Sequence, residues 1–398
     1  MKRGQIPLIA AVALDMTGFG MIIPDIQTRA ELFLRAERWS LPPGVTDGVV
    51  IGLILASMFI VQFLVSPVWG AKSDHLGRKN VFVACTLLSA GAMAVYALAG
   101  TAAMLFASRI IAGLGGANVA VAQASIADST DGKSRAVGLG YLSAAQSTGL
   151  IAGPFIGGVI ATAFGSHVLG WVAMGLSVTG VAAVLLWGEF SQNEAVATRR
   201  KFGFRPLVRE FPKLLPLVLL AGSAWFALAT LEGTFGRLLN AVWGLQEFHF
   251  GLLFGFESVV GLLVQGLLLK RLVAAFPERG LLWTSYILQG LGLAMTPFVP
   301  NLAGLFAASL CYAVGVSVAN PTVNGLCSKS VAEDRQGEVF GVLQSARSIG
   351  FMLGPLIGGA LFDRWHALPY LVAGGVCLLV AFAAPLAVPH AETAPAPG

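Results

Sequence analysis

The sequence predicts an all-α integral membrane protein with twelve transmembrane helices arranged as two six-helix pseudo-repeats. Composition is the first indication, because 56% of the 398 residues are hydrophobic, only 11% are charged, and the mean hydropathy is +0.78. Soluble domains carry about 25% charged residues. The second indication is a motif of glycines and one proline that recurs half a chain later. We therefore expect two copies of one membrane unit.

The apolar runs supply the expected helices in order. A crossing needs about 20 apolar residues, so a chain of this length can hold roughly twelve. The first run carries Asp15 in its middle and lacks a small-residue cleavage site, so we expect a retained helix rather than a signal peptide. The runs lie at 6–26, 48–69, 81–100, 102–125, 137–162, 168–188, 214–236, 249–269, 280–299, 301–326, 339–361 and 368–388.

The runs divide the chain into two bundles. We predict an N-terminal six-helix bundle over residues 1–188 and a C-terminal one over 214–390, joined by a polar cytoplasmic linker over 189–213. Residues 391–398 are expected to form a disordered cytoplasmic tail. Most Lys and Arg residues fall in alternate connections, which the positive-inside rule assigns to the cytoplasm. Both termini are therefore expected on the cytoplasmic side.

The duplicated motif occurs in the fifth and eleventh runs. Small residues spaced by four let transmembrane helices approach closely, so one copy alone would indicate only helix packing. Two copies favour kinked helices at equivalent places in two repeats, as in transporters with parallel internal repeats. The first copy contains Gly149, Gly153, Pro154, Gly157 and Gly158, and the second contains Gly350, Gly354, Pro355, Gly358 and Gly359.

A second motif stands between the second and third runs. It consists of Gly70, Asp74, Gly77, Arg78 and Lys79. Gly77 allows a tight turn, and Asp74 can accept hydrogen bonds at the N-terminus of a neighbouring helix. An ordinary polar hairpin would explain the basic residues but not the ordered Gly, Asp, Gly and Arg. We expect these residues to form a cytoplasmic gate.

With these motifs the whole chain resembles the major facilitator superfamily, whose cytoplasmic signature runs G-x-x-x-D-x-x-G-R-K/R. The segment Arg109 to Gly115 is similar to the fourth-helix motif, and Gly149 to Gly158 is similar to the fifth-helix motif of drug antiporters. Asp15 to Pro24 is similar to the first helix of tetracycline-efflux-like members. Gln265 to Arg279 resembles a worn second copy of the signature, without an acid that corresponds to Asp74. The resemblance implies the major facilitator fold and drug:proton antiport.

Four charged residues fall inside apolar runs, where a charge costs several kcal/mol unless it is paired or hydrated. We predict that Asp15 carries the proton, that Arg109 acts as a fixed cation beside it, and that Glu257 is a further proton-coupling candidate. The depths of Glu257 and Arg347 differ by about 6 Å at about 1.5 Å per residue, so an intramembrane ion pair between them is also expected. Purely structural roles are the alternative for each. Glu232 lies nearer the outer end and is expected in an interfacial ion pair or gate.

Polar and aromatic residues inside the runs are candidates for a substrate cavity. In the resembled family the fourth and tenth helices line the central cavity. Interhelical hydrogen bonds are the alternative role for the amides. The candidates are Asn118, Gln123, Trp225, Phe226, Asn320 and Asn324.

The favoured function is export of a small amphipathic organic compound or drug in exchange for protons, by alternating access. The alternative is a proton symporter or facilitator of a small nutrient or metabolite. We expect no enzyme, because no catalytic or metal constellation appears, and Asp131 to Ser134 only mimic the end of a phosphate loop. The expected partners are the substrate, protons and membrane lipid, with no cofactor, metal or nucleic acid. The chain is expected to act as a monomer in the bacterial inner membrane.

Overall fold

The computed structural model describes residues 5–37, 42, 44–129, 132–188, 214–330 and 336–387. Within these residues, nine helices are long and apolar enough to cross a membrane, and one of them, Gly138–Trp187, has 50 residues. The predicted linker over 189–213 and the tail over 391–398 lie outside the described residues. The all-helical prediction is confirmed for the part of the chain that is described.

The N-terminal half contains six predicted runs but is divided differently into helices. The first run bends at Ile22 and continues to Glu37, and the fourth run is interrupted at Gly116. The fifth and sixth runs form one continuous element in which Gly165, with φ of 82°, turns the chain. The elements are α1 (Gln5–Met21), α2 (Ile23–Glu37), α3 (Asp47–Leu76), α4 (Arg78–Leu98), α5 (Ala102–Gly115), α6 (Asn118–Ser129) and α7 (Gly132–Trp187).

The C-terminal half contains the other six predicted runs and has two irregular turns. A π-helical turn joins α10 to α11 within the predicted eighth run, and a 3₁₀ turn ends the ninth. With these, the described elements account for all twelve predicted runs. The elements are α9 (Leu214–Trp243), α10 (Glu247–Leu263), η1 (Val264–Leu268), α11 (Leu269–Ala275), α12 (Glu278–Met295), η2 (Thr296–Phe298), α13 (Leu302–Lys329), α14 (Gln336–Phe362) and α15 (Leu368–Ala387).

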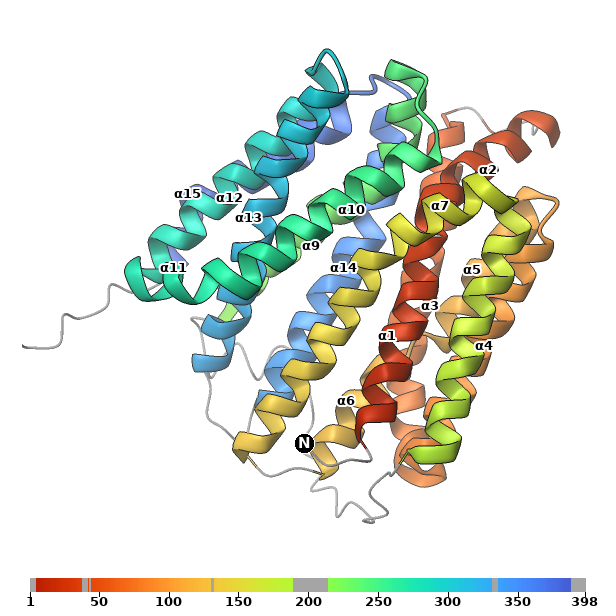
Figure 1. Ribbon diagram of the computed structural model, residues 1–398, viewed down its shortest axis with the longest axis vertical. Coiled ribbons are helices and arrows are strands. Elements are labelled where there is room, and N and C mark those ends of the chain that lie inside the picture. Colours follow the sequence, from red (N-terminus) through yellow and green to blue (C-terminus); the bar gives the residue numbers. More distant parts are fainter. Residues whose placement is uncertain are drawn as a thin grey trace, which may run out of the picture.

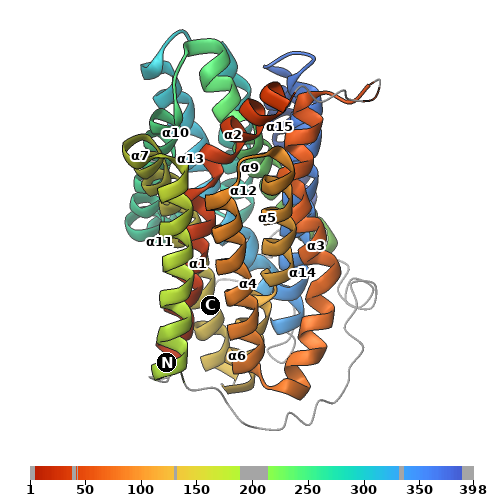
Figure 2. The ribbon, with the colours of Figure 1, turned by 90° about the vertical axis from the view of Figure 1, so that its right-hand side faces the viewer.

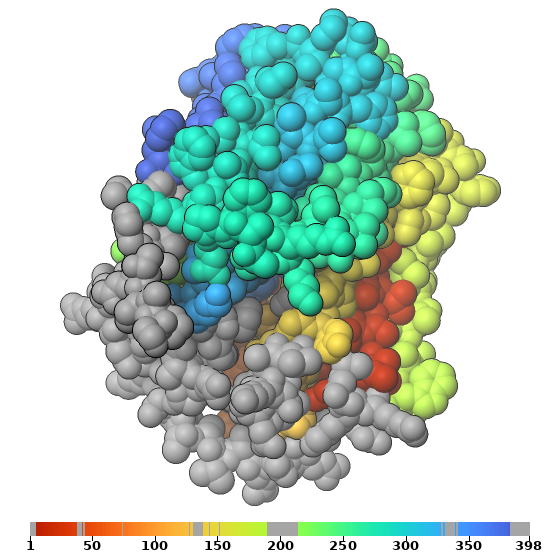
Figure 3. All heavy atoms as spheres, turned by 60° about the vertical axis from the view of Figure 1, so that its left-hand side comes forward, coloured from red at the N-terminus to blue at the C-terminus, as the bar shows by residue number. Residues whose placement is uncertain are grey.

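Helices α1–α7 gather on one side of the molecule and α9–α15 on the other (Figure 1). The halves meet mainly through α3 against α14 and α7 against α10. Figure 2 shows α14 beside α3, and Figure 3 shows the green surface of α10 against the yellow surface of α7. We call the end where α1 begins at Gln5 the N-terminal end, and the opposite end, where α14 stops before Asp363, the Asp363 end.

Polar caps at two helix starts explain where those helices begin. The Thr101 hydroxyl accepts a hydrogen bond from the amide of Met104 at 3.2 Å at the start of α5. The Asn301 side chain accepts one from the amide of Gly304 at 3.0 Å at the start of α13. Such side chains satisfy amides that have no partner in the first helical turn.

The duplicated motif packs in two directions, and the first direction lies within each half. In α7, Gly149, Gly153 and Gly157 face α1, and a methyl group added at Gly153 would lie 2.6 Å from the Gly20 Cα atom. In α14, Gly350, Gly354 and Gly358 face α9 in the same way, and a methyl group at Gly354 would lie 2.7 Å from the Ala229 Cβ atom. Each set of three glycines therefore lets two backbones of one half come into direct contact.

The second direction of the motif joins the two halves. A methyl group at Gly158 of α7 would lie 3.0 Å from the Gly251 Cα atom of α10. The corresponding Gly359 of α14 lies against the backbone of Gly48 and Gly52 in α3. The glycine motif thus packs the fifth and eleventh predicted helices against their own half on one face and against the other half on the second face.

Candidate functional site

Asp15 of α1 is held by side chains of three other helices of the N-terminal half, namely Asn118 of α6, Ser177 of α7 and Ser89 of α4. The Asn118 Nδ2 atom donates to Asp15 Oδ2 at 2.6 Å, and the Ser177 hydroxyl donates to Asp15 Oδ1 at 2.7 Å. Because α5 and α6 are separated by a break, Asn118 is the first residue of α6. Its Oδ1 atom accepts a hydrogen bond from the Val119 backbone amide at 2.7 Å. This bond orients the amide so that its NH₂ group points toward Asp15.

The environment of Asp15 is suited to reversible protonation. Its side chain is only 4% exposed, and among the described residues no basic side chain forms an ion pair with it. All three hydrogen-bond partners are neutral, so uptake of a proton by the carboxylate breaks no salt bridge. An acid of this kind inside a membrane protein is a functional candidate by default.

Asp15 also lines a cavity between the two halves. Its wall includes Phe19 and Phe59 of the N-terminal half, the amides of Gln62 and Gln146, and Gln344 and Arg347 of the C-terminal half. The cavity has a volume of about 30 Å³, which is enough for at least one water. Of the six predicted cavity residues, Asn118 is part of this wall, whereas Gln123, Trp225, Phe226, Asn320 and Asn324 are not.

Arg347 points its guanidinium into this region without forming the predicted ion pair. The guanidinium lies 4.7 Å from the centroid of the Trp225 ring and 5.4 Å from that of Phe351. Glu257 of α10 instead meets Ser309 of α13, and the acid whose charge acts on Arg347 is Glu232. The expectation of a Glu257–Arg347 pair followed from depth alone, which does not determine the direction in which each helix presents its side chain.

Arg109 lies apart from Asp15, in a second cavity of about 30 Å³. The side chain is 2% exposed and packs over the Tyr96 ring, with 5.6 Å between its central carbon and the ring centroid. Its Nη2 atom has no hydrogen-bond partner among the described residues. Glu232 lines the same cavity from the other half. It is only 6% exposed, so it is buried inside the protein and does not lie at the exposed end of its helix, where the sequence had suggested a surface ion pair.

A buried polar network around Asp25 was not predicted from the sequence. Ser166 donates to Asp25 Oδ1 at 2.6 Å, and the Tyr96 hydroxyl donates to Asp25 Oδ2. Arg29 lies 4.0 Å from the same carboxylate and donates to the Tyr96 carbonyl oxygen at 3.1 Å. The network ties α2 to α4 and α7. The signal in the sequence is the Asp25 and Arg29 pair, spaced by four residues at the end of the first apolar run.

An ion cluster joins the two halves at the Asp363 end. Arg237 of α9 donates to Asp363 Oδ1 at 2.7 Å and lies 3.5 Å from Glu31 of α2. The Gly48 amide at the start of α3 donates to Asp363 Oδ2 at 2.6 Å. Near this cluster, the Gln27 side chain of α2 donates to the Glu232 carbonyl oxygen of α9. The halves are therefore closed against each other at this end.

The Asp363 carboxylate should make the stability of this closed contact depend on pH. Its burial alone would raise the pKa, but hydrogen bonds from Thr46 and Arg237, the charge of Arg237 and the Gly48 amide outweigh this effect and lower it. The stabilisation is fully present above the unfolded pKa and is lost as the pH falls through the lower folded pKa. Between about pH 5 and pH 3, we expect the thermal midpoint of wild-type protein to fall more steeply than that of Asp363→Asn. If the thermal midpoints of the two proteins, measured in detergent, fall equally with pH, Asp363 does not have this role.

The predicted gate residues lie at the N-terminal end. Gly77, with φ of 87°, forms the turn between α3 and α4, as expected for a residue in the left-handed region. Arg78 donates from Nε to Asp128 of α6 at 2.9 Å and also contacts Ser73. Lys79 reaches the Gly188 carbonyl oxygen at 3.3 Å, while Gly70 has open space around it. The Asp74 side chain lies outside the described residues.

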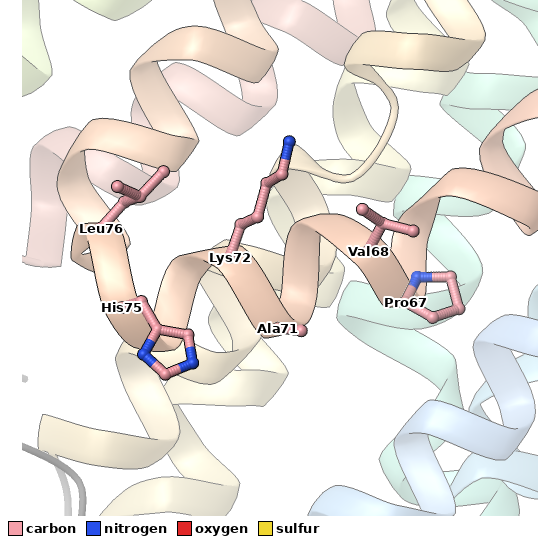
Figure 4. A pocket seen from close by; sticks show the side chains of 6 residues that line it. All are labelled: Pro67, Val68, Ala71, Lys72, His75 and Leu76. Atoms are coloured by element: carbon pink, nitrogen blue, oxygen red, sulfur yellow. The ribbon is translucent and has the colours of Figure 1, made fainter.

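A surface hollow follows the same part of α3 (Figure 4). All six residues that line it belong to this one helix, and Lys72 packs over Trp69 with 5.2 Å between its Nζ atom and the ring centroid. Because the hollow has no second wall and no convergent polar groups, we assign it no binding role. The lining residues are Pro67, Val68, Ala71, Lys72, His75 and Leu76.

Two helical halves with buried charges and cavities at their interface define a multi-pass membrane protein of the secondary-transporter class. The family model of the Major Facilitator Superfamily matches residues 7–347 and, in a second match, 217–397. The chain belongs to this superfamily, and the predicted fold class is confirmed.

Known relatives match the chain over nearly its whole length. Multidrug resistance protein 1 of Bacillus subtilis (strain 168) is 29% identical, with 95% of this chain and 96% of that protein covered. Tetracycline resistance protein, class C, of Escherichia coli is 28% identical, with 95% of each covered. Among solved structures, the human organic anion transporter MFSD10 (TETRAN) has a TM-score of 0.69 and 21% identity, covering 96% of this chain and 99% of that one. The likeness to this solved structure establishes similarity of fold.

Proposed function

We propose that the protein exports a small amphipathic organic compound in exchange for protons. The observation that carries this proposal is Asp15, a buried carboxylate held only by neutral donors at a cavity between the two halves. The relatives support the direction of transport, because their names describe multidrug and tetracycline resistance. Aromatic and amide side chains around Asp15 would suit an amphipathic substrate.

Alternating access would proceed by rocking of the two halves against each other. The Asp363 end, closed by the Arg237 cluster and the Gly359 contact with α3, would face the outside, and both chain termini would lie in the cytoplasm. The bacterial inner membrane is the proposed location. Residues 1–188 and 214–390 would form the two moving bundles, joined by 189–213. In the opposite state, the segment that carries Asp74 and Arg78 would close the N-terminal end, and the contact of Arg78 with Asp128 of its own half would hold this segment in place.

Asp74→Asn should weaken this second closed state without disturbing the state described above. An ionised partner in a hydrogen bond contributes about 1.5 to 3 kcal/mol, which the amide would largely forfeit. Cysteines placed in the cavity wall, for example at Gln344, should react faster with a membrane-impermeant thiol reagent added at the N-terminal end. Unchanged labelling together with full transport activity would count against a gate at Asp74.

Transport by purified protein in liposomes tests the proposed function. With an imposed pH gradient, tetracycline and a lipophilic cation such as ethidium would serve as probes, and protein-free liposomes as the control. Accumulation that depends on the gradient and collapses with a protonophore supports antiport. Accumulation that requires protons to move in the same direction as the probe would favour the symport alternative.

A further inference from the structure

The cavity at Asp15 contains one charge of each sign, and the two charges come from opposite halves. Among the described residues that line it, the charged side chains are those of Asp15 on α1 and Arg347 on α14. They form no ion pair with each other, and the charge that acts on Arg347 is that of Glu232 in its own half. The other lining residues are apolar or carry neutral amides and hydroxyls. The cavity is therefore negative on one half and positive on the other.

The Arg347 guanidinium keeps its hydrogen-bond donors available to a ligand. Its central carbon lies over the rings of Trp225 and Phe351, and contacts of this kind use none of its five N–H groups in conventional hydrogen bonds. Among the described residues, it forms no hydrogen bond and no close ion pair. Glu232 lines the second cavity, so its carboxylate attracts the guanidinium from outside the cavity at Asp15.

Aromatic rings lie beside this charge and continue across the interface between the halves. Phe351 stacks on Phe59 of the N-terminal half with 4.6 Å between the ring centroids, and Phe19 meets Phe59 edge-on at 6.0 Å. Phe19 and Phe59 also line the cavity. A planar ring of a ligand can pack against such side chains. The wall thus offers an aromatic surface next to a carboxylate and a guanidinium.

We propose that the cavity selects compounds that carry both an ammonium group and a carboxylate group, several bonds apart, on an aromatic body. Arg347 is the specificity-determining residue, because its planar guanidinium binds the carboxylate with two parallel hydrogen bonds while Asp15 binds the ammonium group. A compound with only a positive charge is repelled by Arg347, and one with only a negative charge is repelled by Asp15. This inference rests on the proposed export function and names the substrate class of that same site.

The position of the two charges on different halves also connects binding to the transport cycle. In this conformation the cavity volume is about 30 Å³, so a compound of this class binds only when the halves part and the cavity widens. A compound that bridges Asp15 and Arg347 then contacts both halves at once. Its ammonium group and a proton compete for the same carboxylate, which is the competition that exchange requires.

Three fluorescent compounds with the same dansyl ring test this selection by direct binding. Nα-dansyl-lysine carries both charges, dansylcadaverine is the same molecule without the carboxylate, and Nα-dansyl-norleucine is the same molecule without the ammonium group. Binding to the purified full-length protein in detergent would be followed by dansyl fluorescence at about pH 8, where the carboxylate and the amine of the probes are both charged. The wild type should bind Nα-dansyl-lysine at least about tenfold more tightly than either of the other two compounds.

Three variants separate a selective role of Arg347 from a structural one. Arg347→Gln should bind Nα-dansyl-lysine at least about tenfold more weakly and no better than dansylcadaverine, whose own affinity should not fall. Arg347→Lys keeps a positive charge and should retain part of the preference. Arg364→Gln removes an exposed arginine of the same half and should bind all three compounds as the wild type does.

Two results would overturn the proposal. One is an equal loss of affinity for all three compounds in Arg347→Gln, which would show that the residue only supports the fold. The other is a wild-type protein that does not bind Nα-dansyl-lysine or does not prefer it to dansylcadaverine. Because binding is measured without any gradient, a clear preference combined with a failed liposome transport assay would support this inference and contradict only the proposed export.

Discussion

Asp15→Asn should abolish uphill, proton-driven transport while the protein still folds. Asparagine keeps the size of the side chain, and its one oxygen can accept the hydrogen bond of Asn118, while its NH₂ group can donate to the Ser177 hydroxyl oxygen in place of the second bond. It cannot exchange a proton. We expect gradient-driven accumulation of tetracycline in proteoliposomes to fall by at least about a hundredfold, the usual scale for the loss of a proton-transfer group. Equilibration of the probe down its own gradient should remain measurable.

Asp25→Asn provides the matched control for this prediction. Asp25 is also a buried carboxylate of the first predicted helix, but it is fixed by Tyr96, Ser166 and Arg29 rather than placed at a cavity between the halves. We expect this variant to lower thermal stability, because it disturbs a charged network, while the purified protein keeps its dependence on the pH gradient. If Asp15→Asn accumulates the probe at the wild-type rate, Asp15 is not the coupling residue.

Gly153→Ala should destabilise the protein strongly for so small a change. The added methyl group would lie 2.6 Å from the Gly20 Cα atom and 2.8 Å from the Met21 amide nitrogen, so backbone rather than a flexible side chain must move. Overpacking of this kind costs about 1 to 3 kcal/mol. Unfolding in detergent, followed by heating or by chemical denaturant, should show the loss as a lower midpoint.

Gly91→Ala is the control for the glycine prediction. Gly91 lies in the middle of α4, and an added methyl group there would meet open space. Alanine is favoured over glycine inside a helix by about 1 kcal/mol, so this variant should be neutral or slightly more stable. If Gly91→Ala and Gly153→Ala lower the unfolding midpoint equally, the packing of α7 on α1 does not depend on direct contact between their backbones.

The arrangement of helices could be predicted from the sequence because it depends on long apolar runs and on a duplicated motif. The runs contain enough residues to cross a bilayer, and the glycines of α7 and α14 pack as the motif indicates. Depth along a helix was also predictable, and it placed Asp15 inside the bundle. The motif's second face, through which Gly158 and Gly359 contact the opposite half, could not be read from one helix alone.

Side-chain partners were harder to predict because they depend on helix rotation and on local breaks. Glu257 and Arg347 have compatible depths, yet Arg347 stacks on Trp225 and Glu257 turns toward Ser309. Asn118 reaches Asp15 because the fourth predicted helix breaks at Gly116, and no periodicity in an apolar run reveals such a break. For the same reason, the network around Asp25 and the cavity shared by Arg109 and Glu232 emerged only from the folded arrangement.

The direction of proton movement during transport tests the central claim most directly. Purified protein would be reconstituted into liposomes that contain a pH-sensitive dye, with the membrane potential held at zero, and tetracycline would be added outside without an imposed pH gradient. Exchange predicts that protons leave the lumen as the compound enters, so the lumen becomes more alkaline, and that Asp15→Asn shows no such change. Acidification of the lumen, or entry of the compound without any proton movement, would contradict antiport.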